Sequence, residues 1–155
     1  YDINLISFIR GNIEMMNIDP SMLELEVTEG VLINNYQKVS AFLHELKRQG
    51  LSISVDDFGT GYCSLSYLKH LPIDSLKIDR SFIKDVTNSS SDSAIVSAII
   101  ALAQKLNLGI IAEGIETKEQ KSFLLDNNCT IGQGYFYSKA VSVDNFEKLI
   151  QSAQH

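Results

Sequence analysis

The chain has 155 residues, of which 45% are hydrophobic, and it carries a formal net charge of −6. This length is enough for one globular core, and no apolar run reaches the roughly 18 residues of a membrane span. Because no basic block offsets the acidic balance, the sequence argues against binding to DNA or RNA polymers. Cys63 and Cys129 follow no metal-ligand spacing, so we expect free thiols in a reducing, cytoplasmic compartment.

The spacing of apolar residues switches between helical and strand periods along the whole chain. In chain order it predicts a helix over 5–16, a strand over 23–27, a helix over 36–46, a strand over 51–55, a short helix over 64–71, a strand over 75–79, a helix over 94–106, a strand over 109–112, a helix that opens at the capping box Thr117 to Gln120, a strand over 130–137 and a closing helix over 143–150. The polar residues 88–92 read as a connector.

Strands separated by helices predict parallel pairing, and therefore an α/β sheet or barrel. A (β/α)₈ barrel needs eight strands and about 250 residues. The five strands here would then form an incomplete TIM-like barrel whose first third is absent. The alternative is an open, doubly wound five-stranded sheet.

The predicted strands carry polar residues on one face and apolar residues on the other, because side chains alternate along a strand. The polar positions are Glu24 and Glu26, then Ser52, Ser54 and Asp56, then Ser75, Lys77 and Asp79, with Glu113 and Gln133 at the ends of the last two strands. One interpretation is a solvated sheet face. In a barrel, however, these groups would point inward near the carboxyl ends of the strands, where active sites of that architecture lie.

The adjacent acids Asp56 and Asp57 follow the second strand directly, with Phe-Gly-Thr-Gly after them. Either this is an ordinary Asp-rich turn or the two acids share a cation. A cluster of acids with one lysine and one amide needs cations to divide its charge. Oxygen ligands alone suit Mg²⁺ or Mn²⁺.

Five motifs spread over the chain resemble the successive signatures of the EAL-domain family. They are Glu26-Val-Thr-Glu29, Asp56-Asp-Phe-Gly-Thr-Gly61-Tyr, Lys77-Ile-Asp-Arg-Ser-Phe82, Ala112-Glu-Gly-Ile-Glu-Thr117 and Gly132-Gln-Gly-Tyr-Phe136. The family comprises bacterial phosphodiesterases that cut cyclic di-GMP to linear pGpG. The resemblance implies a TIM-like barrel of the EAL type, with residues 1–155 as the C-terminal part of a single EAL domain.

The resemblance also implies a role for individual residues at a site with two Mg²⁺ or Mn²⁺ ions. Glu26 and Asp56 would be metal ligands, Asp57 would belong to the second metal, and Glu113 would be a ligand or the general base. Lys77 would sit by the scissile phosphate or the attacking water, and Gln133 would position the metal-bound water. A structural salt bridge with one of the acids is the alternative for Lys77.

Two further acids match family positions near the site. Glu29 matches the residue that anchors the loop after the double aspartate, which makes residues 57–62 a mobile flap whose Gly59 and Gly61 permit the needed dihedral angles. Glu116 matches a site-proximal acid, and an exposed residue in the first turn of a helix accounts for it equally well.

The sequence departs from the family at several places. The Glu-Ala-Leu motif and the strand with an Asn metal ligand are absent and should lie before Tyr1, while Cys63 replaces the usual Ser and Ala140 the usual Pro. We therefore expect a fragment that turns over cyclic di-GMP poorly or not at all by itself. The parent chain would carry sensory or cyclase domains, with an inner-membrane anchor as one possibility, and homodimers would be common.

Two other functions stay open at this point. A degenerate module could bind cyclic di-GMP or a protein partner without hydrolysis. The absence of the N-terminal third favours this hypothesis for the chain taken alone. A purely structural α/β domain would leave the shared polar face of the strands unexplained. The family residues that fill every covered catalytic position favour the enzyme.

Overall fold

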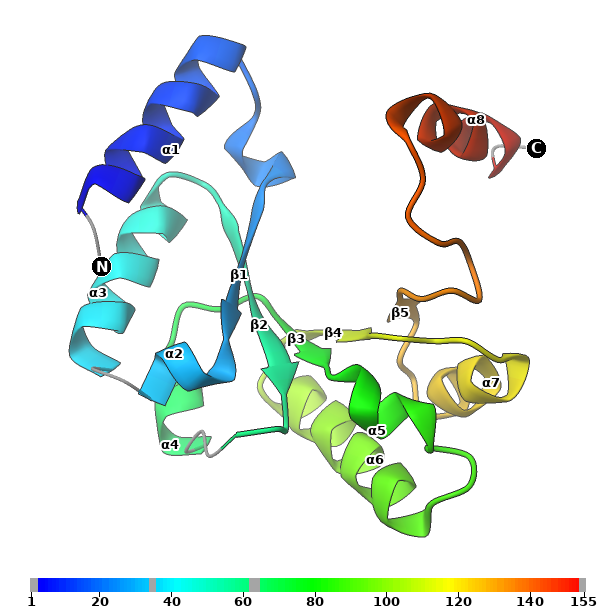
Figure 1. Ribbon diagram of the computed structural model, residues 1–155. Coiled ribbons are helices and arrows are strands. Elements are labelled where there is room, and N and C mark those ends of the chain that lie inside the picture. Colours follow the sequence, from blue (N-terminus) through cyan, green and yellow to red (C-terminus); the bar gives the residue numbers. More distant parts are fainter. Residues whose placement is uncertain (1–2, 34–35, 62–64, 154–155) are drawn as a thin grey trace.

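A computed structural model describes residues 3–33, 36–61 and 65–153 (Figure 1). Its elements are α1 (Ile3–Met16), a 3₁₀ helix (Pro20–Met22), β1 (Glu24–Thr28), α2 (Glu29–Ile33), α3 (Tyr36–Arg48), β2 (Ser52–Phe58), α4 (Leu65–Leu68), β3 (Ser75–Ile78), α5 (Arg80–Lys84), α6 (Ser90–Lys105), β4 (Gly109–Ala112), α7 (Lys118–Asp126), β5 (Ile131–Gly132) and α8 (Val143–Ala153). The expectations at Tyr62, at Cys63 and for a helix start at Ser64 fall outside the described residues.

The five strands form one sheet in the order β1-β2-β3-β4-β5, and every neighbouring pair is parallel. This confirms the predicted α/β class and the parallel sheet. A doubly wound sheet reverses its strand order at a switch point, whereas the order here follows the chain without reversal. The alternative architecture is therefore wrong, and the sheet has the strand order of a barrel segment.

The apolar core lies between one face of the sheet and the helices that join the strands. Ile53 and Val55 of β2, with Leu76 and Ile78 of β3, are fully buried on this face. Helix α3 packs on β2, and α6 packs on β3 and β4. The helices contribute the buried side chains Val39, Leu43, Leu46, Val96, Ile100 and Ala103. The opposite face of the strands is left for the polar residues, as the alternation predicted.

Local structure corrects the sequence prediction in several places. Helix α6 begins inside the expected polar connector, because the Ser89 side chain accepts a hydrogen bond from the Asp92 N–H and caps the helix. The strand predicted over 130–137 ends at Gly132. The chain then turns onto the segment after β4, where Phe136 N–H donates to Ile115 O at 2.9 Å. The short helices α2 and α5 were not predicted.

The C-terminal helix α8 lies apart from the sheet and the other helices (Figure 1). Every side chain from Tyr135 to Ser152 is exposed, including the apolar residues Phe146 and Ile150 of α8. Across the described ranges, no helix is both long and apolar enough to span a membrane.

Candidate active site

A β-bulge in β2 allows both adjacent aspartates to face the same side of the sheet. The register advances from Val55 to Phe58 on β2 while it advances from Leu76 to Ile78 on β3, so β2 holds one extra residue. The backbone accommodates this extra residue at Asp57, which has a φ of +54°. This is a left-handed conformation that Asp tolerates better than most residues. The expectation that the strand ends before the two acids was wrong, since β2 continues through them.

Lys77 forms the centre of the polar face. Its Nζ lies 2.5 Å from Glu26 Oε1, 2.6 Å from Glu113 Oε1 and 3.3 Å from Asp56 Oδ1, and only 5% of its side chain is exposed. Three strands and the residue after β4 thus meet at one ammonium group. The predicted convergence of these groups is present in the structure.

The surroundings of Lys77 keep it positively charged. Burial by itself lowers the pKa of a lysine, but the hydrogen bonds with Glu113 and Glu26 outweigh it and raise the pKa of Lys77 well above its usual range. A raised pKa means that the charge would be lost only in strongly alkaline solution. Lys77 is therefore a fixed cation and not a proton acceptor at neutral pH.

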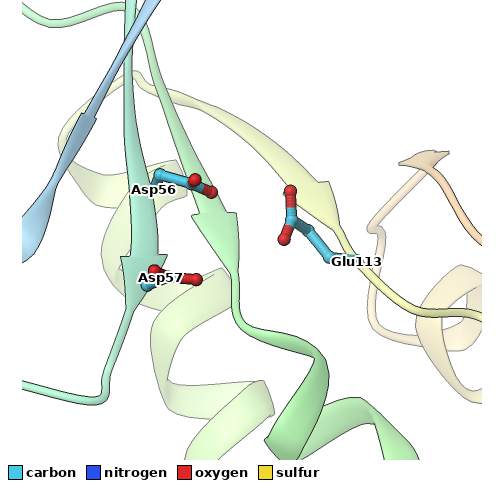
Figure 2. A group of neighbouring side chains, drawn as sticks. All are labelled: Asp56, Asp57 and Glu113. Carbon is cyan, nitrogen blue, oxygen red and sulfur yellow. The ribbon is translucent and has the colours of Figure 1, made fainter.

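Asp56, Asp57 and Glu113 each place a carboxylate oxygen within 4.8 Å of the others (Figure 2). Asp56 Oδ1 is buried and makes no hydrogen bond to any described residue, although it lies near Lys77. A buried anionic oxygen without a hydrogen bond costs free energy unless another positive group reaches it. The three acids therefore fit a divalent cation with oxygen ligands. Glu26 is not one of these three acids and is connected to them only through its ion pair with Lys77.

Asp79 was placed on the polar face by strand alternation but given no role at the site, and in the structure its charge acts on Asp57. Burial, followed by the charges of Asp56 and Asp79, raises the pKa of Asp57. Burial also acts to raise the pKa of Asp79, but hydrogen bonds from Ser81 more than offset it and lower the pKa. The Asp57 and Asp79 carboxylates are therefore close enough for their charges to interact. The sequence could have indicated a role at the site, because Asp79 lies two residues after Lys77 and therefore on the same face of the strand.

Glu29 holds the loop that follows the double aspartate. It is buried, with 3% of the residue exposed, and its Oε2 accepts hydrogen bonds from the N–H groups of Gly59 at 2.9 Å and Gly61 at 3.1 Å. Gly59 has a φ of +101°, and a Cβ on Gly61 would lie 2.9 Å from Glu29 Oε1. Both glycines are therefore required by the local geometry.

A cavity of ≈ 600 Å³ adjoins the acidic cluster on the side of β4 and β5. Glu113 belongs both to the cluster and to the lining of the cavity, and Gln133, which also lines the cavity, donates from Nε2 to Glu113 Oε1 at 2.8 Å. Glu116 also lines the cavity and is exposed. It precedes Thr117, the N-cap of α7, so its interpretation as a residue of the first helical turn is wrong.

Fold and site together define a parallel α/β domain with a lysine-centred acidic cluster at the carboxyl ends of its strands. In α/β barrels that edge of the sheet is where ligands bind and catalysis occurs. The three acids that the structure groups at this edge are carboxylates from β2 and from the segment after β4. The site therefore has the chemistry of a divalent-cation centre beside a ligand cavity.

Comparisons with known proteins agree with this description. The sequence model of the EAL domain matches residues 2–140. Cyclic di-GMP phosphodiesterase NbdA from Pseudomonas aeruginosa is 44% identical over 149 residues, which are 96% of this chain and 19% of NbdA. The solved structure of the MucR phosphodiesterase in complex with cyclic di-GMP matches with a TM-score of 0.90 and 42% identity, over 93% of this chain and 58% of the chain in that structure. The structure of BlrP1 from Klebsiella pneumoniae with manganese and cyclic di-GMP matches with a TM-score of 0.83 and 27% identity, over 90% of this chain and 36% of the chain in that structure.

The chain belongs to the EAL domain family. The match covers nearly the whole chain, and the likeness in sequence extends to the three-dimensional fold. The chain spans about a fifth of the length of NbdA and somewhat more than half of the MucR structure.

Proposed function

We propose that this chain is the C-terminal part of an EAL domain that hydrolyses cyclic di-GMP to linear pGpG with Mg²⁺ or Mn²⁺. The observation that carries the proposal is the contact of Lys77 with Glu26, Asp56 and Glu113 at the carboxyl ends of parallel strands. One lysine cannot balance these acids and Asp57. The names of NbdA and MucR support the substrate, and the manganese complex of BlrP1 supports the kind of metal.

The proposed metal ligands are Glu26 and Asp56, with Asp57 at a second metal and Glu113 as a ligand or general base. Bound divalent cations would lower the pKa of a water molecule and stabilise negative charge on the phosphate. The Asp56 oxygen that makes no hydrogen bond to the described residues supports its role. Glu116, on the cavity wall, is the more distant acid of the site.

The other residues of the proposed site would bind the dinucleotide and orient the attacking water. Lys77 supplies a fixed positive charge where the phosphate becomes more negative in the transition state. Gln133, which donates to Glu113, would hold that carboxylate and orient the attacking water. Glu29 would anchor the loop through Gly59 and Gly61, and the cavity beside Glu113 would take a guanosine part of the dinucleotide.

The length of the relatives supports further proposals about the parent protein. Because the chain spans only about a fifth of NbdA, sensory or cyclase domains before this segment are part of the proposal. Pairing of two copies and the cellular location of the parent stay predictions of the family resemblance. The same holds for the expectation that the 155 residues alone are poorly active.

The test is incubation of the chain with cyclic di-GMP and Mn²⁺, followed by chromatography for pGpG and by a binding titration. Slow turnover that is lost in Asp56→Asn, but kept in the matched surface variant Asp126→Asn, supports the enzyme. Tight binding without turnover in the wild type supports the non-hydrolysing module. A chain that neither binds nor cleaves the dinucleotide overturns the proposal, and fast hydrolysis by a monomer contradicts the expected weak activity.

A further inference from the structure

The Gln120 side chain makes contacts beyond those of the helix cap predicted from the sequence. A capping box needs the N3 side chain to accept from the N-cap N–H, and Gln120 Oε1 does so from Thr117 at 2.9 Å. The same oxygen also accepts from the Glu116 N–H at 2.7 Å, and Gln120 Nε2 donates to Lys84 O at 3.1 Å. Only 5% of Gln120 is exposed. One buried amide therefore joins three segments of the chain.

Two of these segments, α5 and the segment before α7, form one wall of the cavity beside the acidic cluster. Arg80 and Lys84 of α5 line it together with Gly114 and Glu116 of the segment between β4 and α7. At one end this segment touches α5 directly, since a Cβ on Gly114 would lie 2.5 Å from Arg80 Cβ. At the other end the Gln120 amide connects it to the Lys84 carbonyl. The segment is thus fastened to α5 at both ends.

We propose that Gln120 is a positioning residue that sets the spacing between α5 and the segment 113–117, and so fixes the shape of the nucleotide-binding cavity. Gln120 does not touch the cavity itself, and it acts through the backbone of Glu116 and Lys84. The inference rests on the proposed function, because it assigns the nucleotide to this cavity.

The metal-binding acids should be insensitive to Gln120. Asp56 and Asp57 belong to β2, and the Glu113 N–H donates to Ile78 O at 3.2 Å, which ties that residue to β3. The sheet therefore holds these acids without help from α7. Loss of the Gln120 contacts should weaken nucleotide binding while Mn²⁺ binding is retained. A residue that merely stabilised the fold would change both affinities together.

The experiment compares two Gln120 variants with two controls. Gln120→Ala removes all the side-chain contacts, whereas Gln120→Glu keeps the acceptor for Glu116 and Thr117 and loses the donor to Lys84. Thr117→Ala removes the cap hydroxyl but leaves the amide contacts, and Gln104→Ala changes an exposed glutamine of α6. Cyclic di-GMP affinity is measured by calorimetry in the presence of Ca²⁺, and Mn²⁺ affinity by electron paramagnetic resonance.

We expect both Gln120 variants to bind cyclic di-GMP about tenfold more weakly, the size of one lost buried hydrogen bond. Their Mn²⁺ affinity should stay within about twofold of the wild type, as should both affinities of the two controls. Wild-type cyclic di-GMP affinity in Gln120→Glu, or equal losses for nucleotide and Mn²⁺, overturns the role of Gln120.

The two proposals can fail separately. A wild-type chain that does not bind cyclic di-GMP overturns the proposed function. Amide hydrogen exchange then decides the inference alone, because the Glu116 and Thr117 amides depend directly on Gln120 Oε1. Faster exchange of these amides in Gln120→Ala than in Gln104→Ala supports the positioning role, and equal rates overturn it.

Discussion

Two lysines bind carboxylates at opposite ends of the same parallel strands. At the amino end, Lys47 Nζ lies 2.7 Å and 2.8 Å from the two oxygens of Asp74, and Asp74 Oδ2 also accepts from the Ile53 N–H at 2.7 Å. At the carboxyl end, Lys77 contacts Glu26, Asp56 and Glu113 together. Lys47 is thus paired with one acid at the amino end, whereas Lys77 is paired with three acids at the carboxyl end.

The difference shows which end of the sheet is built for stability and which for binding. The Asp74 carboxylate uses both oxygens and joins α3, β2 and the start of β3, so each of its oxygens already has a positive or N–H partner. The Lys77 cluster leaves Asp56 Oδ1 buried without a hydrogen bond among the described residues. An arrangement with excess negative charge is unfavourable by itself and becomes favourable when a cation binds.

The largest expected effect comes from removing the positive charge of Lys77 at the carboxyl end of the strands. Lys77→Met removes the buried cation and leaves the partly buried Asp56 and Glu113 without their positive partner, which should lower the free energy of unfolding by about 3 kcal/mol. Added Mn²⁺ should recover part of this loss, because the metal then supplies the missing charge. Urea denaturation with EDTA and with Mn²⁺ measures both quantities. A variant as stable as the wild type in EDTA would contradict the excess of negative charge.

At the amino end, Asp74→Ala should lower the free energy of unfolding by about 2 kcal/mol, because the N–H of fully buried Ile53 loses its side-chain acceptor. Mn²⁺ should not restore this loss. The exposed Asp126→Ala provides the control for removal of an aspartate. Recovery of Asp74→Ala by Mn²⁺ would erase the distinction between the two ends.

The loop beside the carboxyl end gives a smaller effect. Gly61→Ala places a Cβ 2.9 Å from Glu29 Oε1, and we expect a loss of about 1 kcal/mol from this crowding. Gly11→Ala is the matched control, since it lies inside α1 with no atom within 4 Å of the new Cβ and should stabilise the helix. Thermal unfolding compares the two, and equal shifts in the melting temperature would argue against a tightly held loop.

Lys47→Met should have the smallest effect, about 0.5 kcal/mol, because this ion pair is partly solvated on both sides. Asp74 keeps its bond to the Ile53 N–H in this variant. Added salt should reduce the difference from the wild type further. A loss as large as that of Lys77→Met would show that the number of paired acids does not separate the two ends.

Alternating residues predicted most of the sheet and much of the site. The parity of β1, β2 and β3 placed Glu26, Asp56 and Lys77 on one face, because side-chain alternation is a local property of extended backbone. The bulge at Asp57 could not be predicted in the same way, since it depends on the register between β2 and β3. The early end of β5 likewise depends on backbone contacts with the segment after β4.

The amino-acid sequence by itself determined the α/β class, the polar face of the strands and the family to which the chain belongs. These follow from periodicity and from residue types at fixed spacing, which do not depend on distant partners. Only the tertiary structure decided how Asp57 joins Asp56, which acids reach Lys77 and what Gln120 connects. Those outcomes depend on strand register and on side chains from remote segments meeting in space, which local periodicity does not encode.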